Sequence, residues 1–292
     1  MLGRLRTCRP STLQNASRDE IGLAMNRFPR PSGLITLLTD FGERDTYVGQ
    51  MKAVILSLAP QARLVDLTHA VPPQDILEGS FQLATAWRVF PPGTVHVAVV
   101  DPGVGTARRA LACLAGKQYF VLPDNGVGTL VFRETPPHMV VALDRPQFFR
   151  HPVSRTFHGR DIFAPVAAHL ASGTDLALLG TPIAPSEIVQ LSLTPVVRTP
   201  ERVQGPLLSI DHFGNCRTLI RPEDIPFAYE TALVRCGSVV IHGIHTTYGD
   251  VKPGSPLALF GSHGGLEIAI RNGNAAHELG LRRGDLVEIT SA

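Results

Sequence analysis

The segment TVHVAVVDPGVGTARR, residues 94–109, decides how the first half of the chain is interpreted. It opens with an almost purely apolar, β-branched run over 95–100, which is typical of a strand buried on both faces of a sheet. The run stops at Asp101, and Pro102 with two glycines then allows a compact turn. Arg108 follows within the same loop. The segment therefore predicts a carboxylate at the carboxyl end of a core strand, which is where open α/β sheets bind ligands.

The flanking sequence alternates between strand-like and helix-like patterns. Apolar runs predict strands over 34–39, 63–67, 95–100, 119–122 and 139–143, and helical spacing predicts helices over 47–58, 76–89 and 161–171. This alternation predicts an α/β N-terminal domain with a mostly parallel central sheet. A polar binding rim is expected where four strand ends carry an aspartate, at Asp40, Asp66, Asp101 and Asp124.

The sequence pattern changes near Pro195, where short predicted strands separated by Gly, Pro and Asp turns begin. They lie at 207–211, 232–236, 238–241, 257–260, 266–270 and 286–289. This pattern predicts a smaller all-β, barrel-like C-terminal domain. We expect domains over 33–195 and 200–292, with residues 1–32 as a disordered Arg-rich extension; an organellar presequence is the alternative reading of that extension.

Composition excludes several classes of protein. A formal net charge of +2, without a Lys/Arg stripe, predicts no nucleic-acid partner, and no apolar run approaches membrane-spanning length. The four cysteines form no CxxC pair and predict reduced thiols in a cytoplasmic protein without structural zinc. The glycines of 103–105 do not make a dinucleotide-binding loop, because Arg108 stands where the third glycine would be.

Three further loops carry polar residues suited to a site. His158 lies in TFHGRD, 156–161, just before a predicted helix, where Arg160 and Asp161 are expected to form an ion pair. DHFGN at 211–215 ends a predicted strand, and its asparagine can both donate to and accept from a nucleobase edge. SHGGLE at 262–267 is followed by NGNAA at 272–276. Each also has a purely structural interpretation, as a packing histidine or as glycine turns.

Six motifs together resemble one family in order, from about Gly33 to the C-terminus. They are TDFG at 39–42, DPGVG at 101–105 with Arg108, PDNG at 123–126, TFHGRD at 156–161, DHFGN at 211–215 and LEIA at 266–269. The chain resembles the S-adenosyl-L-methionine hydroxide adenosyltransferases, the hydrolase branch of the superfamily that also holds fluorinases and chlorinases.

The resemblance implies a reaction and a set of residues. Water attacks C5′ of S-adenosylmethionine, the small-molecule substrate, and releases methionine and adenosine without a cofactor. Asp101, Arg108 and His158 match the family's water-handling triad. Family resemblance also implies a homotrimer, with each site between one subunit's N-terminal domain and the next one's C-terminal domain. The implied substrate contacts are Asp40 to the ribose hydroxyls, Asn215 and the backbone around Ala275 to adenine, Asp211 to the methionine ammonium, and Ser262, followed by His263, to its carboxylate.

Two other functions remain as alternatives. A halogenase is disfavoured because Asp101 would repel a halide, and because Gly159 stands where fluorinases have serine. In the halogenases an arginine follows the matching serine and a tryptophan stacks on adenosine, whereas this chain has His263 and Gln74. A non-catalytic protein that binds S-adenosylmethionine or adenosine is the second alternative.

Asp101 cannot by itself produce hydroxide. The pKa of free water is about 15.7 and that of an unperturbed aspartic acid about 3.9, so complete proton transfer would cost on the order of 16 kcal/mol. Either proton loss accompanies the attack, or a cation stabilises the developing hydroxide. Arg108, as a permanent cation and donor, can do the latter without a metal. His158 can orient the water or pass on its proton.

Overall fold

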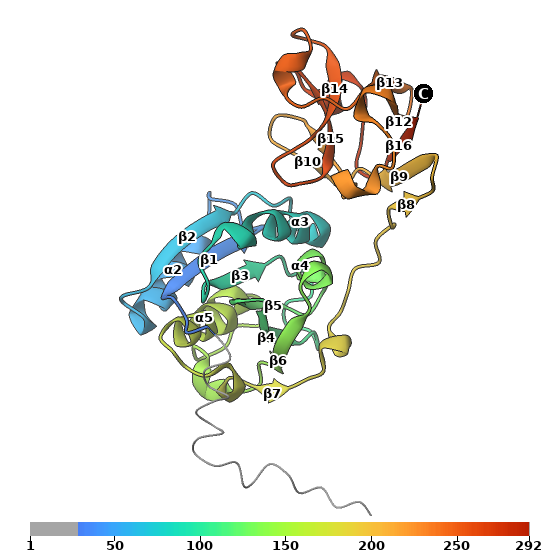
Figure 1. Ribbon diagram of the computed structural model, residues 1–292. Coiled ribbons are helices and arrows are strands. Elements are labelled where there is room, and N and C mark those ends of the chain that lie inside the picture. The colour runs from blue at the N-terminus through green and yellow to red at the C-terminus, as the bar shows by residue number, and fades with distance from the viewer. Residues whose placement is uncertain (1–28, 292) are drawn as a thin grey trace, which may run out of the picture.

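The computed structural model describes residues 29–291, which form two domains (Figure 1). The first predicted segment, 1–32, lies almost entirely outside the described residues. Within the described part, no helix is long and apolar enough to cross a membrane. The α/β N-terminal domain and the all-β C-terminal domain confirm the predicted fold class, and 33–195 and 200–292 stay our proposed boundaries.

A seven-stranded sheet forms the N-terminal domain, in the order β2-β1-β3-β5-β4-β6-β7. Its strands are β1 (Leu34–Thr39), β2 (Arg63–Thr68), β3 (Val95–Val99), β4 (Ala110–Ala115), β5 (Gln118–Pro123), β6 (Pro137–Ala142) and β7 (Thr181–Pro182). The pairs β1–β2, β1–β3 and β3–β5 are parallel, whereas β4 runs against both of its neighbours. Every residue of β1, β3, β4 and β5 is buried, as expected of strands covered on both faces.

Helices pack on the faces of this sheet. They are α2 (Tyr47–Leu58), α3 (Ile76–Ala86), α4 (Thr129–Glu134) and α5 (Ala164–Ala171), the last preceded by a π-helical segment, Gly159–Phe163. Asp75 caps α3, because its side chain accepts from the backbone N–H of Glu78 at 3.0 Å. The helix expected over 76–89 ends at Ala86 and continues as a 3₁₀ turn through Val89.

Strand β4 is one of the elements that the sequence patterns did not predict. It forms a tight hairpin with β5, in which Ala115 pairs with Gln118 across a two-residue turn. Gly116 occupies that turn with a φ of +57°, a conformation that glycine adopts at little cost. The hairpin inserts an antiparallel strand between β5 and β6, so the sheet is mixed although most of its strands run in one direction.

The C-terminal domain consists of two antiparallel sheets that enclose one apolar core. One sheet has the order β13-β12-β16-β9-β8 and the other β10-β11-β15-β14. Their strands are β8 (Val197–Arg198), β9 (Arg202–Pro206), β10 (Ser209–Ile210), β11 (Cys216–Arg217), β12 (Ala232–Cys236), β13 (Val239–His242), β14 (Pro256–Phe260), β15 (Leu266–Ile270) and β16 (Leu286–Ser291). A short helix, α6 (Ala275–Glu278), follows β15.

Polar and apolar contacts join the two domains. Phe81 of α3 and Leu130 of α4 share a buried cluster with Leu208, which precedes β10. Glu78 of α3 accepts a hydrogen bond from Ser209 Oγ at 2.9 Å. Helices α3 and α4 are therefore the parts of the N-terminal domain that contact the four-stranded sheet and its flanking residues.

His96 makes the stability of the core depend on pH. Its ring is fully buried in β3, with Nδ1 2.7 Å from Thr36 Oγ1 and Nε2 hydrogen-bonded to Gln118 Oε1. Burial lowers the pKa of His96 to about 4, whereas an unfolded histidine titrates near about 6.5. Between these values the unfolded chain binds more protons, so stability rises with pH in that window.

We expect the free energy of unfolding to reach its highest value above about pH 6.5 and to fall as the pH approaches 4. His96 should contribute up to about 1.36 kcal/mol per pH unit to this fall. Chemical denaturation of wild type and His96→Asn from pH 4.5 to 7 measures this slope. The slope should become shallower in His96→Asn and stay unchanged in His138→Asn, which alters an exposed histidine. Equal slopes in all three proteins would contradict the assignment.

Candidate active site

The carboxyl ends of three adjacent parallel strands carry aspartates at one edge of the sheet. Asp40 follows β1, Asp101 follows β3 and Asp124 follows β5. The Asp124 carboxylate is used for hydrogen bonds within the fold, because it accepts from Arg109 Nε at 2.8 Å and from the backbone N–H of Val189 at 2.8 Å. The fourth predicted rim residue, Asp66, lies within β2 and pairs with Lys52 of α2 at 2.6 Å. Of the four aspartates predicted to form a binding rim, Asp40 and Asp101 therefore remain as candidates for contact with a ligand.

Arg108 joins Asp101 to His158. Its Nε donates to Asp101 Oδ1 at 3.0 Å, its Nη2 donates to Asp101 Oδ2, and the same Nη2 lies 3.0 Å from His158 Nδ1. The Asp101 and Arg108 side chains are only 4% and 8% exposed. The structure thus brings together the three residues that the sequence predicted as catalytic, and it places them in a single charged cluster.

These contacts fix the chemical state of the imidazole. Arginine has no acceptor, so His158 Nδ1 has to accept from Arg108, and in the neutral ring the proton then resides on Nε2. Burial and the neighbouring guanidinium lower the pKa of His158. His158 is therefore a neutral ring whose Nε2–H can donate to a water molecule or to a substrate oxygen.

Asp101 is the carboxylate of this cluster. Burial raises the pKa of Asp101, while the ion pair with Arg108 opposes that rise. A bidentate guanidinium favours the ionised carboxylate, and each oxygen keeps a lone pair that Arg108 does not use. The carboxylate is thus buried, more basic than an exposed aspartate and held in one orientation.

The loop between Asp101 and Arg108 owes its path to Gly105. This residue has a φ of +77°, and a Cβ built on it would lie 2.2 Å from the backbone oxygen of Arg155. Gly103 has no such restriction, because the nearest atoms to a Cβ there are 3.6 Å away. Gly105 therefore allows the loop that carries Arg108 to approach the segment that leads to His158.

His158 is held by the turn that precedes α5. It lies directly before the π-helical segment, in which Asp161 is fully buried. Arg160 Nε donates to Asp161 at 2.7 Å, which confirms the predicted ion pair, and the backbone N–H of Ser154 donates to the same carboxylate at 2.8 Å. Asp161 thus ties the two sides of the loop together and fixes the direction of His158.

Asp40 is presented by an anchored turn. Its Oδ2 accepts from the backbone N–H of Gln74 at 2.7 Å, and Gln74 has a φ of +68°. The preceding residue, Thr39, bonds His69 Nδ1 at 2.8 Å, and Gly42 donates its N–H to the carbonyl of His69 at 2.8 Å. The segment after β2 therefore closes over Asp40, and the backbone of Gln74 occupies one of its oxygens.

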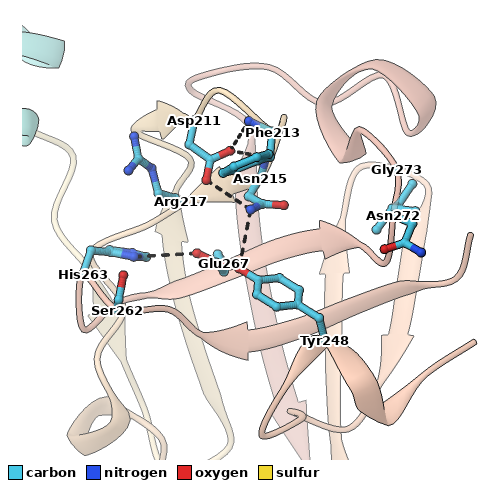
Figure 2. A pocket seen from close by; sticks show the side chains of 11 residues that line it. Asp211, Phe213, Asn215, Arg217, Tyr248, Ser262, His263, Glu267, Asn272 and Gly273 are labelled. Carbon is cyan, nitrogen blue, oxygen red and sulfur yellow. Dashed lines mark hydrogen bonds and ion pairs between the residues drawn. The ribbon is translucent and has the colours of Figure 1, made fainter. Parts of the chain in front are cut away.

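A pocket of about 610 Å³ lies in the C-terminal domain (Figure 2). It contains four of the six residues predicted to bind substrate: Asp211, Asn215, Ser262 and His263. They come from two loops of the four-stranded sheet, one between β10 and β11 and one between β14 and β15. Residues that the sequence analysis did not assign to substrate also line it, namely Phe213, Arg217, Tyr248, Glu267, Ile270, Asn272 and Gly273.

Asp211 organises the first of these loops. Its Oδ1 accepts from the backbone N–H groups of Phe213 and Asn215, both at 2.9 Å, and its Oδ2 accepts from Asn215 Nδ2 at 3.1 Å. These bonds orient the Asn215 amide and leave its oxygen free. Ala275 is fully buried at the start of α6, and the next residue, Ala276, donates its N–H to Gly214 O at 3.0 Å. Ala275 therefore lies behind this loop and does not line the pocket.

Glu267 is an unusual buried acid in the pocket wall. Its side chain is 4% exposed, it accepts from the Tyr248 hydroxyl, and its Oε2 lies 3.8 Å from His263 Nδ1 (Figure 2). Burial raises the pKa of Glu267, and the nearby Asp211 raises it further. LEIA at 266–269 was noted as a motif, but in a strand whose residues are all buried the pattern does not reveal which side chains reach a pocket.

The triad and this pocket are separate in one chain. Asp101, Arg108 and His158 belong to the sheet edge of the N-terminal domain, and none of them lines the pocket formed by the described residues. Among residues 29–291, no group of three or more His, Cys, Asp and Glu side chains is placed to hold a metal ion. The chain thus carries a charged cluster on one domain and a polar pocket on the other.

The comparisons with known proteins place this arrangement in a family. The model of the SAM hydroxide adenosyltransferase N-terminal domain matches residues 35–180, and that of the C-terminal domain matches residues 205–288. The chain belongs to this family.

Several relatives cover nearly the whole chain. An (R)-S-adenosyl-L-methionine hydrolase of Thermus thermophilus is 40% identical, over 86% of this chain and 96% of its own. A crystal structure of an uncharacterized conserved protein from Thermotoga maritima superposes with a TM-score of 0.82 at 38% identity, covering 88% of this chain and 99% of that one. A fluorinase of Actinoplanes is 28% identical over 89% of this chain and 98% of its own.

The two loop glycines provide a matched pair for a test. Gly105→Ala should lower the melting temperature and the binding of any ligand at the triad, because the new methyl group collides with backbone that cannot yield. Gly103→Ala should melt within a few degrees of wild type, since its methyl group meets only ordinary contacts. Thermal unfolding of both variants is the measurement. Equal melting temperatures would show that the Gly105 turn does not constrain the loop.

Proposed function

We propose that this protein hydrolyses S-adenosyl-L-methionine to adenosine and L-methionine. The observation that carries the proposal is the buried Asp101–Arg108–His158 cluster in a chain whose two domains both match the SAM hydroxide adenosyltransferase family. The curated relative at 40% identity is named for hydrolysis of the (R) form of S-adenosyl-L-methionine. We extend hydrolysis to this chain.

The cluster supplies what the uncatalysed reaction lacks. Methionine leaves from a sulfonium as a neutral thioether, so departure needs no acid, and the barrier lies in providing a nucleophile. Asp101 accepts a proton from water as the oxygen attacks C5′, and Arg108 stabilises the negative charge that develops on that oxygen. The Nε2–H of His158 orients the water, and positioning in line with the C5′–S bond supplies much of the remaining acceleration.

Burial makes this division of roles efficient. The gap between the pKa of water and that of an ordinary carboxylate corresponds to about 16 kcal/mol, which excludes free hydroxide as an intermediate. Burial raises the pKa of Asp101 and so reduces the difference between its pKa and that of water. The remaining free-energy cost of forming hydroxide is avoided because the proton is transferred while the oxygen attacks, next to a fixed guanidinium.

The other residues suit the parts of the substrate. We assign Asp40 to the ribose hydroxyls, Asn215 to adenine with Ala275 as backbone support, Asp211 to the ammonium group, and Ser262 with His263 to the carboxylate end. The bonds around Asp211 support this assignment, since they leave the Asn215 carbonyl oxygen available to a base. Tyr248 is 41% exposed at the same pocket and offers a ring against which adenine can stack, in the absence of a tryptophan at Gln74.

An assembly of several copies completes the proposal. We infer a homotrimer in which the triad of one subunit faces the C-terminal pocket of the next. The separation of triad and pocket in one chain supports it, as do the exposed apolar side chains Tyr47, Leu56 and Val65 on α2 and edge strand β2. The proposal also includes a cytoplasmic location, supported by the three free buried cysteines among residues 29–291, and water as the only co-reactant.

Halide transfer is less compatible with this geometry. A halide nucleophile needs a desolvated pocket of donors, whereas the triad offers a carboxylate that is only 4% exposed. At the position of the fluorinase serine, Gly159 is packed so closely that a Cβ would lie 3.2 Å from Met51 Sδ and 3.2 Å from Phe41 Cε2. Hydrolysis is therefore the reaction we infer.

Product analysis tests the reaction directly. Purified protein incubated separately with the (R) and (S) sulfonium epimers should release adenosine and methionine in equal amounts from at least one of them. Chloride and fluoride should not change the products. Asp101→Asn should lower kcat by about 100-fold or more while the dissociation constant for substrate changes by less than about threefold.

Asp124→Asn is the matched control, because it disrupts a buried Asp–Arg pair one strand away. Asp124→Asn should lower the free energy of unfolding, and it should lower kcat much less than Asp101→Asn does. Bound substrate with no adenosine from wild type would make the protein a binding protein, and a halogenated nucleoside would make it a halogenase.

The pH dependence tests the roles of the two titrating groups. Protonation of either Asp101 or His158 disables the cluster, so kcat/KM should be constant near neutrality and fall at acid pH below about 6.5, with a limiting slope above one. In His158→Gln one of the two titrations is removed, and the acid limb should become shallower. An acid limb of unchanged slope in this variant would contradict a neutral His158 in the mechanism.

A further inference from the structure

Arg217 is the cation of the C-terminal pocket. It ends strand β11, and its side chain lines the pocket next to Asp211 and His263 (Figure 2). It is the only Lys or Arg among the described residues that line this pocket. Asp211 and Arg217 therefore set a negative and a positive group side by side, as the two charged groups of an α-amino acid require.

The guanidinium has donors that the fold does not use. Nη2 donates to Ser209 Oγ, whereas the buried Nε has no hydrogen-bond partner among the described residues. The nearest carboxylate oxygen, Glu78 Oε1, is 3.7 Å from Nη2 and already accepts from Ser209 Oγ and Gln82 Nε2. Arg217 is thus held in place without being tightly neutralised.

Packing holds the side chain against helix α3. Its guanidinium carbon lies 4.8 Å from the centre of the Phe81 ring, which belongs to α3 of the N-terminal domain. The His263 ring packs against the same phenylalanine, with centroids 5.7 Å apart. Phe81 therefore supports the two residues that flank the end of the pocket where Ser262 lies.

His263 cannot supply the positive charge at this end. Its side chain is only 6% exposed, and burial together with Arg217 and Arg221 lowers the pKa of His263 to about 4. The ring is therefore neutral at neutral pH, and Ser262 contributes only a hydroxyl group. A carboxylate bound here needs a cation, and burying it without one is costly.

We propose that Arg217 determines specificity for the amino-acid part of the substrate by binding the methionyl carboxylate, while the adjacent Asp211 accepts the ammonium group. The proposal rests on the function proposed above and assigns a residue that the family motifs did not indicate. The arginine that follows the serine in halogenases is thus replaced here by one from a neighbouring strand.

The test compares two ligands that differ only in this carboxylate. Dissociation constants for S-adenosylmethionine and for its decarboxylated analogue are measured by calorimetry in the Asp101→Asn background, which slows turnover. Adding Arg217→Met should weaken S-adenosylmethionine about 10- to 100-fold, as expected for a charge-assisted contact, and should change the analogue by less than about threefold. Arg217→Lys, which keeps a point charge and guards against misfolding of the first variant, should recover part of the discrimination.

Arg221→Met provides the control. Arg221 also joins the domains, through Glu134 at 2.8 Å, and holds the carbonyl oxygen of His263 at 2.9 Å, but it does not line the pocket. Its loss should affect both ligands equally. If Arg217→Met weakened the binding of both ligands equally, Arg217 would have only a structural role. Unchanged affinities for both ligands would show that Arg217 is not part of the site. Failure of wild type to produce adenosine would overturn the proposed reaction instead, independently of these affinities.

Discussion

The Arg108 guanidinium is the contact on which the candidate active site depends. It is 8% exposed and binds a carboxylate on one side and an imidazole on the other. Removing one partner of a buried ion pair typically costs about 3–5 kcal/mol, because the other charge remains buried without compensation. The same cation fixes the tautomer of His158 and opposes the effect of burial on Asp101. One side chain thus sets both the geometry and the protonation states of the cluster.

The two domains carry different parts of the candidate site. The N-terminal sheet places its aspartates at the carboxyl edge, whereas the C-terminal domain offers a polar pocket built from loops. Helix α3 connects the two, since Glu78 and Phe81 contact Ser209 and Arg217 across the domain boundary. The pocket wall is therefore held against the domain that carries the Asp101–Arg108–His158 cluster, although these three residues do not line the pocket of the same chain.

The sequence predicted those features that local patterns encode. The apolar run before Asp101 predicted a buried strand, and the family resemblance implied the residues that meet at Arg108. Strand β4 was not predicted, because ALACLA at 110–115 follows the loop directly and only its pairing with β5 identifies it as part of a hairpin. Arg217 and Glu267 were not assigned to the pocket, because which strand side chains reach a pocket depends on how the sheet packs against its neighbours. Their roles emerge only from the tertiary structure.

The origin of the new oxygen tests the central claim most directly. In ¹⁸O-enriched water, turnover should give adenosine with one ¹⁸O atom at the 5′ position and methionine without label, because water attacks carbon and the C5′–S bond breaks. Mass spectrometry of the two products measures this. Adenosine without ¹⁸O would contradict direct attack by a water molecule held by Asp101, Arg108 and His158.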